Sequence, residues 1–82
     1  MADAQYVSNE QATFVLSSLA SPRNFDTLAR NVSHEYGIET GEAELILEGM
    51  QEPGLIEIDE IGFDRRCYLT DTGKEFLKTR RR

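Results

Sequence analysis

The sequence predicts a small α+β domain in which three short helices are followed by a β-hairpin and a final helix. Apolar residues recur at helical spacing in three successive segments, and the stretch 55–61 alternates with an approximate period of two residues. Gly and Pro residues separate these segments. Three short helices cannot close a core alone and an isolated hairpin is unstable, so the elements are expected to pack against one another.

The first two helices are predicted from their end signals and their apolar stripes. Ser8 and Gln11 have the spacing of a capping box, and Pro22 is expected to end the first helix. Asn24 is expected to cap the second helix, and Gly37 suits the left-handed position at its C-terminus. The residues expected to face the core are Ala12, Val15, Leu16 and Leu19 in the first helix and Phe25, Leu28, Ala29 and Val32 in the second.

The third helix follows after a link of two residues. Thr40 is expected to cap it, and it is expected to run to about Glu52 before Pro53-Gly54 ends it. Its apolar stripe is Ala43, Ile46, Leu47 and Met50. Glutamates occupy much of the remaining surface of this segment, which holds no Lys or Arg.

The hairpin and the last helix complete the predicted order. Residues 55–61 are expected to form the first strand with Ile56 and Ile58 on one side, and 67–70 a short return strand after a turn over 62–66. The candidate caps of the last helix are Asp71 and Thr72, and the residues expected to face the core are Phe76 and Leu77.

Length and composition indicate one soluble domain. The 82 residues are 39% hydrophobic and 29% charged, without an apolar run long enough to span a membrane and without a secretory signal. Residues 1–7 are expected to be a flexible N-terminus, 8–79 the domain and 80–82 a basic tail. Cys67 is the only cysteine, which excludes an intrachain disulfide and fits a cytoplasmic protein.

Charge is distributed unevenly along the chain. The net charge is −6, with about −8 in residues 37–73 and about +4 in residues 74–82. Nucleic-acid-binding domains usually present a basic face. An acidic body with a basic end therefore does not match a general nucleic-acid binder.

In their order and spacing, the elements resemble the winged helix-turn-helix superfamily, specifically small regulators of the MarR, PadR and ArsR kind. The resemblance covers residues 8–79 and rests on the segment FDTLARNVSHEYGIETGEAELILEGM, on Gly54-Leu55-Ile56, and on Leu69-Thr70 followed by Gly73. It implies a three-helix bundle with a two-stranded hairpin wing and a short C-terminal helix. It also implies double-stranded DNA as partner and a role in transcription regulation.

The resemblance identifies the third helix as the recognition helix, whose N-terminal residues would meet base edges in the major groove. The matching positions are Thr40, Gly41, Glu42, Glu44 and Leu45, of which Thr40, Gly41 and Glu44 are the predicted DNA contacts. Arg65 and Arg66 are expected at the wing tip and are the predicted wing contacts. A solvated hairpin is the alternative for this pair, with the arginines bonded to Asp59, Glu60 or Asp64.

Further cations are candidates for contacts to the DNA backbone: Arg23, Arg30, Lys78, Arg80, Arg81 and Arg82. Those at the C-terminal end have a second interpretation, because cations near a helix C-terminus also complement the helix dipole. The sequence is consistent with both interpretations.

The glutamates of the third helix leave three hypotheses. The protein is a winged-helix regulator that contacts DNA mainly through its wing and tail, since acidic side chains repel phosphates. Alternatively, it is an interaction module that docks on a protein partner through a surface comprising Glu42, Leu45, Glu48 and Gly49, without binding DNA. A third explanation is an organism with a salty cytosol and acidic proteins, in which acidity does not exclude DNA binding.

Enzyme chemistry, cofactors and metals are not predicted. His34 and Cys67 are the single histidine and cysteine, and they are expected to be an exposed helix-end side chain and a buried strand side chain. The sequence has no phosphate-binding glycine loop and no metal-ligand spacing. Short termini indicate a monomer or a weak homodimer.

Overall fold

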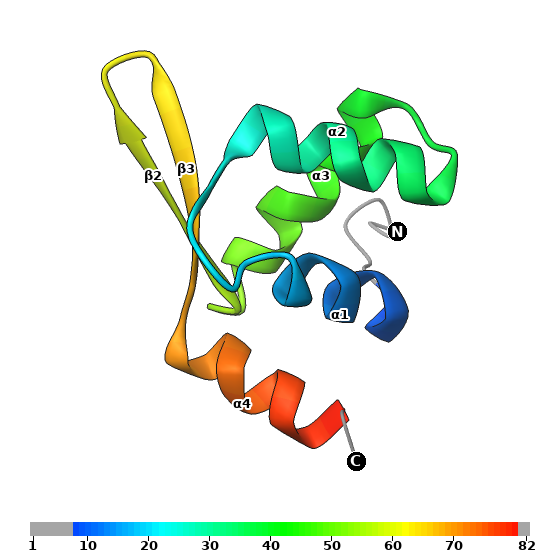
Figure 1. The fold of residues 1–82 in the computed structure, drawn as a ribbon, viewed down its shortest axis with the longest axis vertical. Coiled ribbons are helices and arrows are strands. Elements are labelled where there is room, and N and C mark those ends of the chain that lie inside the picture. The colour runs from blue at the N-terminus through cyan, green and yellow to red at the C-terminus, as the bar shows by residue number, and fades with distance from the viewer. Residues whose placement is uncertain (1–7, 81–82) are drawn as a thin grey trace.

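The chain folds in the order α1, β1, α2, α3, β2, β3, α4 (Figure 1). A computed structural model describes residues 8–80, so the predicted flexible segment 1–7 lies outside the described residues. The bounds are α1 Asn9–Ser17, β1 Arg23–Asn24, α2 Phe25–Tyr36, α3 Thr40–Gln51, β2 Ile56–Ile61, β3 Asp64–Leu69 and α4 Asp71–Arg80. The predicted α+β class and the order of helices and hairpin are confirmed, and β1 is an addition.

The N-terminus of α1 is closed by the predicted capping box. The Gln11 amide donates to Ser8 Oγ at 3.1 Å, and the Ser8 amide donates to Gln11 Oε1 at 3.3 Å. The prediction that Pro22 ends this helix was wrong, because the helix already ends at Ser17. Ser18 is the C-cap, and its hydroxyl donates to the Phe14 carbonyl at 2.9 Å.

Helix α2 has both predicted end signals. Asn24 Oδ1 accepts from the Thr27 amide at 3.1 Å, and Gly37 adopts the left-handed conformation with φ +63°. The prediction that Thr40 caps α3 was wrong, because Thr40 is itself the first helical residue. Glu39 is the N-cap and makes no side-chain capping bond, so only its carbonyl serves the helix by accepting from the Ala43 amide at 3.0 Å.

The sheet has the antiparallel order β1-β3-β2. In the hairpin, Ile56 pairs with Leu69 and Ile58 with Cys67, so these side chains share the face that packs on the helices. Strand β3 begins at Asp64, whereas a turn was expected over 62–66 and a return strand over 67–70. Only Gly62 and Phe63 connect the strands, so the two arginines 65 and 66 lie within β3 and not at the wing tip.

The core lies between the helices and the inner face of the sheet, and every position predicted from helical spacing in the first three helices is buried. Phe76 and Leu77 of α4, together with Ile58, are partly buried against it. The fully or nearly fully buried residues are Ala12, Val15, Leu16, Leu19, Phe25, Leu28, Ala29, Val32, Ala43, Ile46, Leu47, Met50, Ile56 and Cys67.

Thr70 joins the base of the hairpin to α4. Its hydroxyl lies 2.5 Å from the Gly54 carbonyl oxygen and 2.9 Å from that of Leu55, and it accepts the Gly73 amide at 3.0 Å. Thr70 therefore caps α4, and the prediction of Asp71 or Thr72 as the cap was wrong. Gly73 is buried, and a Cβ built on it would lie 2.3 Å from the Leu55 carbonyl oxygen.

This close approach makes Gly73→Ala a sharp test of the junction. We expect the substitution to lower the free energy of unfolding by about 2 kcal/mol, because a backbone clash outweighs the helix propensity gained by Ala. Urea denaturation measures the change. Gly41→Ala is the matched control, since a Cβ at Gly41 meets nothing within 4 Å, and it should stabilise the protein by up to about 1 kcal/mol. Equal effects of the two substitutions would contradict this account of the junction.

Candidate nucleic-acid interface

The hairpin places its two neighbouring arginines on opposite faces, because side chains alternate along a strand. Arg65 pairs with Glu60 on the inner face, which also carries Cys67. Arg66 pairs with Asp59 on the outer face. The predicted pair of wing contacts is therefore divided between two environments.

Arg65 turns toward the body of the protein. Its guanidinium carbon lies 3.7 Å from the centroid of the fully buried Phe25 ring at the start of α2. Its Nη1 lies 3.8 Å from Oε2 of Glu48 on α3. The ion pair joins half-exposed groups and adds little, whereas a guanidinium over an aromatic ring contributes about 0.5–2 kcal/mol. Arg65 thus connects the hairpin to both helices of the helix-turn-helix, and its ion-pair partner is none of the three acids expected from the sequence.

Arg66 remains available at the surface. It is exposed, and the structure shows no ion pair for it within the described residues. Asn24 of β1 pairs with it across the sheet, and the Asn24 side chain donates to Asp64 Oδ1 at 3.2 Å. The outer face therefore presents one free guanidinium, with Asp59 opposite it on β2.

The tip of the hairpin is apolar. Gly62 has φ +62°, and Phe63 beside it is fully exposed. Ile61, the last residue of β2, is 59% exposed. The sequence predicts only a turn here, and the exposed aromatic side chain was not expected. A large apolar residue within a predicted turn was the available signal.

The exposed surface of α3 is acidic along its length. Thr40, Gly41 and Glu42 are exposed at its N-terminus, and Glu44 is half-buried. Residues 39–64 contain nine carboxylates and no Lys or Arg. The three exposed large apolar side chains of the described chain also fall within this range: Leu45, Ile61 and Phe63.

Leu45 on the same surface is 45% exposed. Gly49, one turn further along α3, is half-buried. Glu48 on the same surface is the residue paired with Arg65. Of the four residues of the predicted protein-binding surface, three are exposed and one is partly covered.

The remaining predicted backbone contacts are scattered over the molecule. Arg23 Nε donates to the Ser18 carbonyl at 2.6 Å, which ties β1 to the end of α1. Arg30 on α2 and Lys78 on α4 are exposed. The Arg80 side chain, Arg81 and Arg82 lie outside the described residues. The hairpin tip and α4 lie at opposite ends of the longest axis, so a duplex contacting both would have to run along it (Figure 1).

The two residues considered for catalysis lie as predicted. His34 is exposed in the last turn of α2, and Cys67 is fully buried in β3. Burial raises the pKa of the Cys67 thiol to about 11, although the nearby Arg65 acts to lower it. In the described part of the chain, no group of three or more His, Cys, Asp or Glu side chains is arranged to hold a metal ion.

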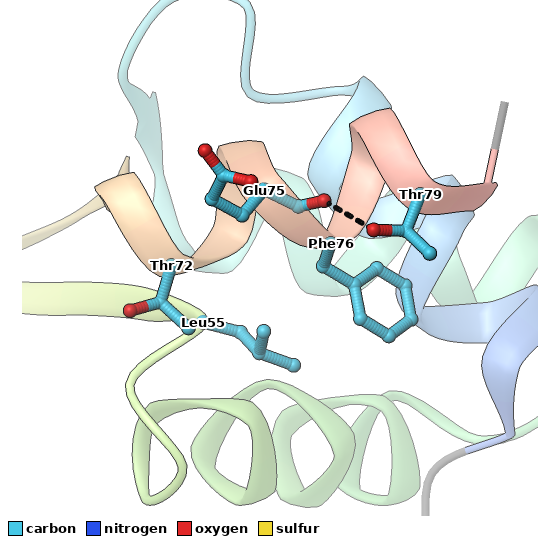
Figure 2. Close-up of a pocket in the computed structure, with 5 residues that line it drawn as sticks. All are labelled: Leu55, Thr72, Glu75, Phe76 and Thr79. Carbon is cyan, nitrogen blue, oxygen red and sulfur yellow. Dashed lines mark hydrogen bonds between the residues drawn. The ribbon is translucent and has the colours of Figure 1, made fainter.

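One open groove of about 300 Å³ lies beside α4. Figure 2 shows Leu55 at the base of the hairpin on one side and Phe76 of α4 on the other. Thr79 and Glu75 continue the α4 wall, where the Thr79 hydroxyl donates to the Glu75 carbonyl at 3.0 Å. No helix among the described residues is long and apolar enough to cross a membrane.

The arrangement of elements is that of a winged helix. The chain superimposes on a solved structure described as the complex structure of hsRosR-S1, with a TM-score of 0.72 over 95% of this chain and 72% of that chain. The two sequences are 22% identical, so the likeness shows the winged-helix fold alone. No protein-family model and no curated protein matches the sequence.

Sequence reasoning missed the inward direction of Arg65, although a usable signal was present. Cys67 was expected to be buried, and a residue two positions earlier in a strand shares its face. The pairing with Glu48 had no such signal, because it joins α3 to β3 through tertiary packing. Strand β1 was missed because two residues are too short to show a period.

Substituting Arg65 tests whether its contacts serve mainly to stabilise the fold. We expect Arg65→Ala to lower the free energy of unfolding by about 1–2 kcal/mol, through loss of the ring stack and of the packed aliphatic stem. Arg65→Lys should recover only part of the lost free energy of unfolding, because an ammonium lacks the planar guanidinium group. Glu48→Gln should change stability by less than about 1 kcal/mol, since this pair is half-exposed. An unchanged midpoint in urea for Arg65→Ala would rule out the connection.

Because the thiol is buried, we expect the protein to lose stability at alkaline pH. Below about pH 7.5 the thiol is protonated in both states, so it contributes no pH dependence. As the pH rises from 9 to about 11, the unfolded state releases this proton first and the free energy of unfolding falls by up to about 2–3 kcal/mol. Urea denaturation of wild type and of Cys67→Ala at several pH values in this range measures the change in free energy of unfolding. The difference in free energy of unfolding between wild type and Cys67→Ala should become smaller as the pH rises. A difference that stays constant with pH would contradict the prediction.

Proposed function

We propose that this protein is a DNA-binding transcription regulator of the winged-helix type, which meets the duplex mainly through the outer face of its wing. The observation that carries the proposal is the free, exposed Arg66 on that face of a winged-helix domain. The winged-helix fold supports it, because helix-turn-helix domains commonly place a helix in the major groove of DNA. Closer assignment to the MarR, PadR or ArsR kind stays a prediction.

The N-terminus of α3 has a limited role in this proposal. Thr40 and Gly41 are exposed and uncharged, so they can approach base edges without repelling phosphate. Glu44 can accept a hydrogen bond from the amino group of cytosine. The remaining carboxylates of α3 keep the rest of this helix away from the phosphates, and the wing therefore carries the main contact.

Backbone contacts from elsewhere would add affinity. Arg30 and Lys78 are exposed, and the sequence continues with three arginines at 80–82. Arg23 has a competing hydrogen bond to the Ser18 carbonyl and is the weaker candidate. Because so few cations are involved, the affinity should fall less steeply with salt than that of a basic DNA-binding domain.

High salt offers one setting in which the acidic surface is compatible with DNA. The Debye length falls from about 10 Å at 0.1 M to about 3 Å at 1 M salt, which screens repulsion between glutamates and phosphates. The chain itself is acidic, with a net charge of −6. A saline cytoplasm is accordingly part of the proposal, together with a monomeric or weakly dimeric state and the lack of catalytic activity.

The second candidate function is docking on a protein through α3 without DNA binding. The exposed Leu45 amid Glu42, Glu44 and Glu48 favours it, because an apolar side chain rimmed by acids suits a basic partner. Leu45→Glu distinguishes the two functions. It should leave DNA affinity nearly unchanged and abolish docking of a protein partner.

The test of wing-led DNA binding compares two charge changes on the same face of the hairpin. We expect Arg66→Ala to weaken binding to a mixed-sequence duplex by roughly tenfold and to lower the salt slope by about 1, as for loss of one phosphate contact. Asp59→Asn, which removes the acid opposite Arg66, should strengthen binding. Fluorescence anisotropy at several salt concentrations measures both.

Two results would contradict the proposal. If wild-type protein leaves the duplex unbound at both low and molar salt, DNA is not its partner. If it binds but Arg66→Ala binds equally well, the wing face is not the contact. Circular dichroism of each variant verifies that the fold is retained.

A further inference from the structure

One edge of the sheet is open. In the order β1-β3-β2, the short strand β1 pairs with one side of β3, and β2 is the last strand on the other side (Figure 1). Within residues 8–80, the backbone of residues 56–61 makes no backbone hydrogen bond outside its ladder with β3. The outer side of β2 therefore presents unpaired donors and acceptors to solvent, as edge strands do.

The register determines which residues face the open edge. Ile61 and Asp64 close the ladder across a loop of two residues, so they form a hydrogen-bonded pair. Hydrogen-bonded and non-hydrogen-bonded pairs alternate along an antiparallel ladder. The odd-numbered residues of β2 therefore direct their N–H and C=O groups toward β3, whereas Ile58 and Glu60 direct theirs outward.

The side chains along this edge are mostly acidic. Glu57 and Asp59 lie on the outer face of the sheet and Glu60 on the inner face, and all three are exposed. None of the three forms an ion pair within the described residues. Ile58 is half-buried on the inner face, and Ile61 is 59% exposed near the tip. The edge thus combines unpaired carboxylates with two apolar positions.

A second copy of β2 is a poor partner for this edge. Antiparallel pairing of two such strands would place carboxylates beside carboxylates, which is destabilising. Charges on edge strands commonly prevent self-association in this way. That role explains the acids but not Ile61 and Phe63, which are large, exposed apolar side chains at the end of the same edge. A basic strand with apolar residues among its cations matches both features.

We propose that the open edge of β2 binds a basic, extended segment of a protein partner by strand addition. The backbone of that segment pairs with the outward-facing groups of β2, and its Lys or Arg side chains lie opposite Glu57, Asp59 and Glu60. An apolar side chain of the segment packs beside Ile61. The site differs from the α3 surface and does not require DNA binding.

The first experiment titrates isotope-labelled protein with the acetylated and amidated peptide VKKVKV, followed by NMR. In antiparallel register its three lysines lie opposite Glu60, Asp59 and Glu57. We expect saturable shifts at residues 56–63 with a dissociation constant on the order of 10⁻⁴ M, weakening as salt rises. Amide exchange at Ile58 and Glu60 should slow on binding, whereas that of the residues already bonded to β3 should stay unchanged.

Two methylated peptides separate strand addition from simple charge attraction. N-methylation of the fourth residue, opposite Ile58, removes a donor that faces β2 and should weaken binding by about tenfold. N-methylation of the third residue, opposite Asp59, alters an amide that points away from β2 and should leave binding nearly unchanged. Equal affinities of the two peptides would overturn strand addition.

The second experiment changes the protein. Glu57→Lys reverses one charge on the edge and should weaken binding of VKKVKV by about fivefold. Glu42→Lys is the matched control, because Glu42 is also exposed but lies at the start of α3, and this variant should bind like wild type. Circular dichroism verifies that both variants retain the fold.

Three results would overturn the proposal. One is the absence of saturable binding up to about 5 mM peptide. Another is equal binding by Glu57→Lys and wild type. The third is a set of shifts at residues 56–61 that grows as the protein is concentrated without peptide, which would show that a second copy covers the edge.

Discussion

The structure depends on the junction at which Thr70 holds the base of the wing against α4. One hydroxyl lies within hydrogen-bonding distance of the Gly54 and Leu55 carbonyls and accepts the Gly73 amide, so the end of α3, the start of β2 and the start of α4 meet at a single side chain. The absence of a Cβ at Gly73 lets the helix approach the Leu55 carbonyl oxygen. Two of the three local motifs that marked the sequence as winged-helix-like, Gly54-Leu55-Ile56 and Leu69-Thr70 with Gly73, are thus the two halves of one contact.

The wing is held a second time by Arg65, nearer its tip. Because this guanidinium lies over Phe25 and beside Glu48, the inner face of the hairpin is attached to both helices of the helix-turn-helix. The outer face keeps Arg66 free. The two arginines, although adjacent in sequence, therefore have different roles: one orients the wing and the other is available to a ligand.

Acidic and basic side chains also lie mainly on different elements of the fold. Strand β2 and α3 together carry six carboxylates and no cation, whereas β1 and β3 carry Arg23, Arg65 and Arg66 with one carboxylate, Asp64. Under the proposed function, the acidic α3 would direct phosphate contacts toward the β3 side of the sheet. The apolar side chains Leu45 and Phe63 lie on the acidic side, where they favour contacts with protein over contacts with DNA.

Local patterns in the sequence determined the helices, three of their caps, the buried stripes and the hairpin, because each is set by residues within a few positions of one another. Asn24 and Gly37 illustrate this: their roles need only the neighbouring backbone. Tertiary structure alone decided the pairing of Arg65 with Glu48, the cap supplied by Thr70 and the groove beside α4. Those features depend on which segments, distant in the sequence, come into contact in the fold. A side chain in a strand finds its partner on the helix packed against that strand, and short-range sequence periodicity does not specify that helix.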